Sequence, residues 1–173
     1  MINEKEKVSI FIDGSNLYHS LKGNNIKISF EDLIKLLETK RQIVDIFYYN
    51  AELEEKYNLL GYKKHMEFLE KISKIPNFHI VLCRLKRIIL KDGSISFEMK
   101  GDDVCLAADL IKGSYENLYD VAIIVSGDED FIPAIKIVQK NGKKVINAFF
   151  PKSSPNRLID CCNNSINLKR LLS

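Results

Sequence analysis

The stretch VAIIVSGDEDF, from Val121 to Phe131, decides the fold. It begins with five apolar, mostly β-branched residues and then changes at once into a turn of small residues with three acids. A continuous apolar run bounded by turn residues is typical of a central parallel strand that is buried on both faces. Ser126 and Gly127 favour a sharp turn, and either Asp128 or Asp130 can cap the helix that follows. The stretch therefore predicts a buried strand followed by acidic residues at the carboxyl edge of the sheet, where open α/β sheets bind ligands.

Similar patterns along the chain predict the other elements. Further strands are predicted at 8–12, 43–49, 78–82 and 145–150, with a β-hairpin at 88–99. Apolar residues at helical spacing predict helices near 17–21, 29–37, 53–75, 104–111 and 130–140, and a C-terminal helical segment at 153–173. Strands that alternate with helices predict an α/β fold, a three-layer sandwich with a mostly parallel central sheet of about five strands plus the hairpin. The 173 residues suit a single domain, 1–173.

The composition narrows the class of protein. With 46% hydrophobic and 28% charged residues, the chain is typical of soluble globular proteins. It has no apolar run of transmembrane length and no signal-peptide pattern at its start, so we expect a cytoplasmic protein. The four cysteines lack CxxC spacing, which favours reduced thiols. The net charge of +3 permits a nucleic-acid partner but does not argue for one.

Acidic residues follow two of the predicted strands. Asp13 follows the strand at 8–12, and Asp128 and Asp130 follow the strand that ends at Val125. Because the carboxyl ends of adjacent parallel strands converge, these carboxylates can lie close together. Clustered carboxylates either share protons or hold a hard cation such as Mg²⁺ or Mn²⁺, which supports phosphodiester hydrolysis by activating water. Asn16 and Ser126 could then contact a phosphate oxygen or a metal-bound water.

A second group of acids surrounds one predicted helix. Asp102 and Asp103 precede it and Asp109 lies within it. Asp109 is seven residues from Asp102, which is about two helical turns, so these two share a face. The periodicity leaves open whether Asp102 or Asp103 faces the site. The three histidines are scattered, without the spacing of a metal site or of a Ser-His-Asp triad.

Basic residues offer a weaker signal. Some of them could follow a phosphate backbone close to the acids: Arg84, Lys86, Arg87, Lys100, Lys112 and Arg157. The lysines of the predicted long helix are more typical of a solvated helix face: Lys63, Lys64, Lys71 and Lys74.

Three segments carry a family resemblance. FIDGSN at 11–16, KGDDVCLAAD at 100–109 and SGDEDF at 126–131 together resemble the NYN domain, a branch of the PIN-like nuclease superfamily, and in particular its bacterial LabA-like members. The resemblance covers roughly 8–149 and implies a PIN-like fold with metal-dependent ribonuclease activity. The chain departs from the pattern near its end, where Asn163 and Ser165 stand in place of an acid and an aromatic residue, and at Asp102, where the family more often has an apolar residue.

Together with the reading of the residues, the resemblance implies a set of site residues. The expected catalytic residues are Asp13, Asp103, Asp128 and Asp130. The expected metal ligands are the same four and Asp109, holding Mg²⁺ or Mn²⁺. The expected substrate-binding residues are Asn16, Ser126 and Lys100.

Three functions compete on this basis. The first is a metal-dependent ribonuclease that cleaves RNA endonucleolytically, with single-stranded RNA as the expected substrate. We expect no membrane partner, and the sequence leaves open whether the protein is a homodimer. The alternative is a non-catalytic RNA- or protein-binding regulatory module that keeps the acidic metal pocket. A phosphatase of the haloacid dehalogenase type ranks last, because such enzymes typically have a second Asp where this chain has Ser15.

Overall fold

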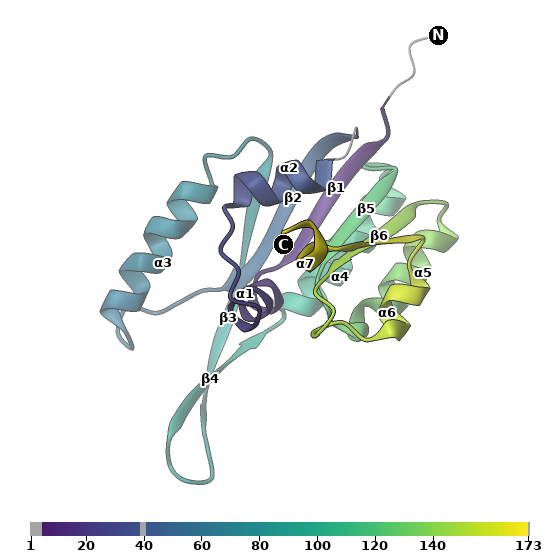
Figure 1. The fold of residues 1–173 in the computed structure, drawn as a ribbon. Helices are drawn as coiled ribbons and strands as arrows, with labels where there is room; N and C mark the ends of the chain where they lie inside the picture. Colours follow the sequence, from purple (N-terminus) through teal and green to yellow (C-terminus); the bar gives the residue numbers. More distant parts are fainter. Residues whose placement is uncertain (1–4, 39–40, 173) are drawn as a thin grey trace.

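The computed structural model describes residues 5–38 and 41–172, which form a three-layer α/β sandwich around one seven-stranded sheet (Figure 1). The strands are β1 (Lys7–Asp13), β2 (Gln42–Ala51), β3 (Phe78–Ile89), β4 (Ile95–Lys100), β5 (Val121–Val125), β6 (Lys144–Phe149) and β7 (Asn164–Asn167). The helices are α1 (Gly14–Gly23), α2 (Phe30–Glu38), α3 (Leu59–Ile72), α4 (Asp102–Tyr115), α5 (Ile132–Lys140), α6 (Asn156–Cys161) and α7 (Leu168–Leu171), with a 3₁₀ turn η1 (Glu129–Phe131) before α5.

The strand order is β4-β3-β2-β1-β5-β6-β7, and every neighbouring pair is parallel except β3 and β4. From β1 the chain builds outward through β2 and β3, then crosses back through α4 to β5 and builds outward on the other side. The direction of winding therefore reverses between β1 and β5. In open α/β sheets, ligands bind at the carboxyl ends of the strands at such a switch point.

Two helical layers cover the sheet, because successive side chains of a buried parallel strand point to opposite faces. Val8, Ile10 and Ile12 of β1 pack in one apolar cluster with residues of α1, α2, α3 and α7. Phe11 packs in a second cluster with residues of α4, α5 and α6. Asp13 shares the parity of Phe11, so strand geometry directs its side chain toward the α4 layer.

The predicted fold class is confirmed, with one difference at the C-terminus. The segment 153–173 contains the helices α6 and α7, but β7 lies between them and adds a sixth parallel strand. β7 has the sequence NSIN, in which Ile166 is the only apolar residue. No apolar run marks it because it is a short edge strand, held to β6 through backbone pairing.

Local signals place most of the other boundaries. The Ser29 hydroxyl accepts a hydrogen bond from the Asp32 amide at 3.0 Å and donates one to its carboxylate at 2.7 Å, so the predicted cap of α2 is present. Helix α3 begins later than predicted, at Leu59, because the Asn58 side chain caps it by accepting from the Gly61 amide at 2.8 Å. The predicted hairpin is confirmed.

The β3–β4 hairpin extends beyond the body of the sheet, past the edge at which β1 ends (Figure 1). In the part of the chain that the structure describes, no helix combines the length and apolar character needed to cross a membrane.

Candidate active site at the switch point of the sheet

The carboxylate of Asp13 is built into the junction between β1 and α1. Asp13 keeps extended backbone geometry and caps α1, because its Oδ1 accepts a hydrogen bond from the Asn16 amide at 2.9 Å. The residue is only 6% exposed. An N-cap acid is favourable at the positive end of a helix, which explains how the fold accepts a carboxylate at this depth.

A second loop, the one that follows β5, is fastened to this junction. The Ser126 hydroxyl donates to Asp13 Oδ2 at 2.9 Å and accepts from the Asp128 amide at 3.0 Å. In return, the Asn16 side-chain oxygen accepts from the Gly127 amide at 2.9 Å. Two of these hydrogen bonds, Ser126 to Asp13 and Gly127 to Asn16, hold the ends of β1 and β5 together, and the first of them helps to fix the direction of the Asp13 carboxylate.

Gly127 is required by the close packing of this loop. A Cβ atom at this position would lie 1.9 Å from the backbone oxygen of Ser153, a distance that no real contact allows. Asn147 of β6 supports the same loop from inside the sheet. It is fully buried, and its amide group donates to the backbone oxygens of Ile124 at 3.3 Å and Ser126 at 2.9 Å.

Asp128 and Asp130 follow on the same loop. The Asp128 side chain accepts from the Asp130 amide at 2.9 Å and caps η1, so of the two acids that the sequence offered as a cap, Asp128 forms one, on the turn that leads into α5. Asp128 is half-buried and Asp130 is exposed. Asp128 therefore has a structural role as the cap of η1.

The first turn of α4 supplies two further acids. Burial is the main cause that raises the pKa of Asp103 to about 6, and the charges of four other carboxylates contribute to the same rise: Asp102, Asp13, Asp128 and Asp130. Burial also raises the pKa of Asp13, as do the charges of Asp102 and Asp128, while its bonds to Asn16 and Ser126 act in the opposite direction. The five aspartates therefore form one electrostatic unit, which we call the aspartate cluster: Asp13, Asp102, Asp103, Asp128 and Asp130.

Asp109 occupies a different environment, two turns further along α4. Its Oδ2 accepts a hydrogen bond from the Tyr49 hydroxyl at 2.9 Å. Tyr49 is almost fully buried, and burial and the Asp109 charge both raise the pKa of its hydroxyl, which stays protonated and keeps donating. Asp109 is therefore held by Tyr49 of β2, the residue that pairs with Asp13 in the register of the sheet.

The model of the NYN domain matches residues 7–169, which is nearly the whole chain.

The chain belongs to the NYN domain family.

NYN domains are part of the PIN-like superfamily and are generally nuclease-like. The chain is similar in structure to a protein of unknown function from Vibrio parahaemolyticus RIMD 2210633, with a TM-score of 0.75 and 24% identity over 97% of this chain and 96% of that one. A putative oxidoreductase from Parabacteroides merdae ATCC 43184 matches with a TM-score of 0.35 and 13% identity, over 94% of this chain and 31% of that one. No curated protein matched the chain.

The NYN domain has a donor set whose chemistry fits a hard divalent cation. Carboxylate oxygens are the ligands that Mg²⁺ prefers, and it usually takes one or two of them while keeping several waters. Mutual repulsion within the aspartate cluster is also relieved by a bound cation. Among the described residues, however, no three acidic, histidine or cysteine side chains come together as a ready metal site. The cluster therefore suits an ion held by few direct protein ligands.

The structure places most of the predicted site residues of the NYN domain around one edge. Asp13, Asp103, Asp128 and Asp130 belong to the aspartate cluster, and Asn16 lies directly beside it. The side chain of Lys100 lies outside the described part of the chain. Ser126 is buried and both of its hydrogen bonds are internal, so its described role is to orient Asp13.

Sequence reasoning missed two residues of this NYN domain that shape the site and left a third undecided. Asp102, one of the two acids between which the periodicity does not decide, acts on the pKa of both Asp13 and Asp103. Asn147 and Tyr49 support the site from within the sheet. A signal for Asn147 was present, because it is the one polar side chain inside the apolar run at 145–149. Nothing in the sequence links Tyr49 to Asp109.

Proposed function

We propose that this NYN domain is a metal-dependent ribonuclease that cleaves RNA endonucleolytically with Mg²⁺ or Mn²⁺. The observation that carries the proposal is the aspartate cluster, in which burial and like charge raise the pKa of two carboxylates at the switch point of the sheet. Perturbed carboxylates of this kind gather at functional sites. The nuclease-like character of the family supports the same reading.

The residues divide into three roles under this proposal. Asp13, Asp103 and Asp128 would hold the ion, in part through the waters that it keeps, with Asp130 and Asp109 completing or orienting its surroundings. A bound divalent ion supplies an acidified water and a positive charge against the phosphate. Ser126 and the Asn16 amide hold Asp13 in one direction, so that its carboxylate need not reorganise when substrate arrives.

Two side chains have further tasks. Asp103 can also accept a proton from the attacking water through a carboxylate oxygen that is not bound to the ion. The side-chain oxygen of Asn16 is engaged by Gly127, which directs its amide nitrogen away from that bond and leaves it as a donor for a phosphate oxygen. Lys100 and the exposed Arg84 and Lys86 of the hairpin would follow the RNA backbone.

The test is cleavage of end-labelled RNA, single-stranded and hairpin, with Mg²⁺, with Mn²⁺ or with EDTA. Asp13→Asn and Asp103→Asn should each lose activity by roughly a hundredfold or more. Glu67→Gln, which removes an exposed acid from α3, should keep the parent's rate. A circular RNA separates the modes of attack, because only an endonuclease opens it. Intact RNA with the parent protein under every metal condition would overturn the proposal.

Two sequence features favour a second function, a regulatory module that binds RNA or protein without cleaving it. The net charge is only +3, and Asn163 and Ser165 stand in place of the acid and the aromatic residue of the family pattern. Under this reading, RNA binding in EDTA survives Asp13→Asn and the parent shows no turnover. Loss of turnover in the aspartate variants, with binding retained, decides for the ribonuclease.

A further inference from the structure

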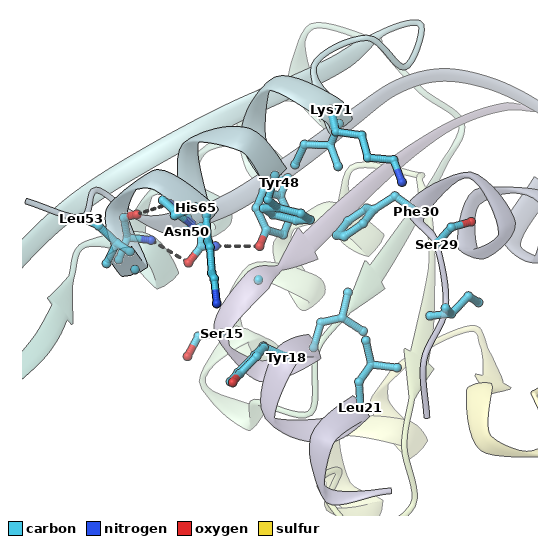
Figure 2. Close-up of a pocket in the computed structure, with 18 of the residues that line it drawn as sticks. Ser15, Tyr18, Leu21, Ser29, Phe30, Tyr48, Asn50, Leu53, His65 and Lys71 are labelled. Atoms are coloured by element: carbon cyan, nitrogen blue, oxygen red, sulfur yellow. Dashed lines mark hydrogen bonds between the residues drawn. The ribbon is translucent and has the colours of Figure 1, made fainter. Parts of the chain in front are cut away.

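A large cavity lies on the opposite side of the sheet from α4. It encloses about 900 Å³ between α1, α2, α3 and the end of β2 (Figure 2). This volume is within the range of pockets that take small organic ligands, roughly 300–1,000 Å³. The aspartate cluster does not account for it, because α4 and the loop after β5 contribute no residue to its lining.

Aromatic rings form much of the cavity wall. The ring of Phe30 lies 5.2 Å from that of Tyr48 and 5.7 Å from that of Phe68, each at a steep angle. Tyr18 of α1 lines the opposite side and is 59% exposed. In Figure 2 these walls face a common space, with Phe30 and Tyr48 on one side and Tyr18 below. Such surfaces suit a planar aromatic ligand, which stacks on rings with little regard to its substituents.

One face of α3 adds positive charge to this apolar space. Lys64, Phe68 and Lys71 recur at helical spacing and all line the cavity. Within the described part of the chain, neither lysine forms an ion pair. Glu31 is the one acid in the lining. The cavity therefore combines aromatic walls with two free cations, a combination that favours a planar ligand with an anionic group.

Polar groups at the end of β2 can fix the orientation of such a ligand. The Tyr48 hydroxyl accepts a hydrogen bond from the Asn50 amide at 2.6 Å, and burial raises its pKa, so its proton remains available to donate. One ring nitrogen of His65 lies 3.2 Å from the Ala51 oxygen. Burial lowers the pKa of His65, so the ring is neutral at pH 7 and offers hydrogen bonding rather than charge.

The cavity and the aspartate cluster are adjacent at the start of α1. Gly14 and Ser15 line it and directly follow Asp13. A Cβ atom on Gly14 would lie 2.8 Å from the Tyr48 ring, so the start of α1 packs directly on the cavity wall. The charge of Asp13 also contributes to the raised pKa of Tyr48. Only the end of β1 separates the two sites, so a ligand that crosses this edge of the sheet can reach both.

We propose that this cavity is a nucleotide-binding subsite, with the base against the aromatic walls and a phosphate near Lys64 and Lys71. The nucleotide has two sources, a free mononucleotide or one residue of an RNA strand whose neighbouring phosphate lies at the aspartate cluster. In naming RNA, the inference rests on the proposed ribonuclease function. The subsite itself stands on the cavity and is tested without cleavage.

The experiment measures binding to the whole protein in EDTA. The probes are a short fluorescent RNA, a base-free phosphodiester strand of equal length, and adenosine and uridine monophosphates as competitors, all followed by fluorescence anisotropy. The double variant Lys64→Ala with Lys71→Ala is compared with Lys63→Ala with Lys74→Ala, which removes equal charge from lysines that do not line the cavity. Tyr18→Ala removes an exposed ring at low risk to the fold.

We expect the cavity variant to lose roughly tenfold or more in nucleotide affinity, and the matched control to stay within about twofold. Tyr18→Ala should weaken base-containing ligands by about fivefold or more and leave the base-free strand unchanged. If adenosine or uridine monophosphate competes with the fluorescent RNA, the ligand of the subsite is a free mononucleotide. If the RNA strand binds and the mononucleotides do not compete, the ligand is a nucleotide within RNA.

Three results would overturn the subsite: equal losses in both lysine variants, equal affinity for the base-free strand, or no binding by any probe. The outcome is independent of catalysis. Binding in the cavity by a protein that leaves RNA intact would refute hydrolysis alone, whereas cleavage with binding that ignores Lys64 and Lys71 would refute the subsite alone.

Discussion

Asp103→Asn should make the protein more stable while it removes activity. In the folded protein the pKa of Asp103 rises from 3.8 to about 6, because burial and the neighbouring aspartates disfavour its charge. A shift of this size corresponds to at most about 3 kcal/mol of destabilisation by the ionised form. Asp103 is only partly buried, so solvent screening reduces this to about 1 kcal/mol. For a domain of this size, the melting temperature should rise by about 2–4 °C.

The gain in stability of Asp103→Asn over the parent should be larger at high pH than at low pH. Because the folded pKa is raised, the parent loses stability as its folded form ionises, so the variant's advantage is complete above about pH 6. As the pH falls from about 6 toward 3.8, the folded parent takes up a proton at Asp103 and the advantage shrinks. Below that range, both states of the parent are neutral at this position and the two proteins should melt together.

The assay is thermal unfolding followed by circular dichroism, in EDTA, at several pH values between 4 and 8, a range set by the two pKa values. Glu67→Gln is the control, because a change at an exposed position away from the cluster should stay within about 0.5 kcal/mol of the parent. An Asp103→Asn protein that melts no higher than the parent at pH 8, or whose advantage persists at pH 4, would refute the electrostatic reasoning.

Three further outcomes are expected. Mg²⁺ or Mn²⁺ should raise the melting temperature of the parent more than that of Asp103→Asn, and equal shifts would argue against an ion at the aspartate cluster. Gly127→Ala should cost about 1–3 kcal/mol by urea unfolding because of its close packing, whereas Gly23→Ala, with open space around its Cβ, should be neutral or stabilising; similar effects would contradict this packing. Tyr49→Phe should cost about 1 kcal/mol in the same assay, because Asp109 loses its donor, and an unchanged midpoint would show that the bond contributes nothing.

The strands and the acids at their ends were predictable from local sequence. The apolar run at 121–125 and the turn after it locate Asp128 correctly, since burial on both faces leaves no other place for such a run. The same logic locates Asp13. In both cases one short segment contains the strand, the turn and the functional side chain.

The features that escaped prediction depend on contacts between distant segments. The hydroxyl of Ser126 donates a hydrogen bond to Asp13, which lies far away in the sequence. Lys64 and Lys71 match the pattern of a solvated helix face, but their positions on α3 place them along a cavity, since helical periodicity does not reveal what lies opposite the helix. β7 carries almost no apolar signal because its stability comes from pairing with β6.

The hydrogen bonds that join the loops after β1 and β5 have a consequence for the protein during its synthesis. They link Asp13 to Ser126 across 113 positions, and Asn16 to Gly127 across 111. A chain that is still growing on the ribosome exposes its first aspartate long before the partners that orient it exist. Under the proposed function, the nascent polypeptide therefore has no assembled active site while its own mRNA is still being translated.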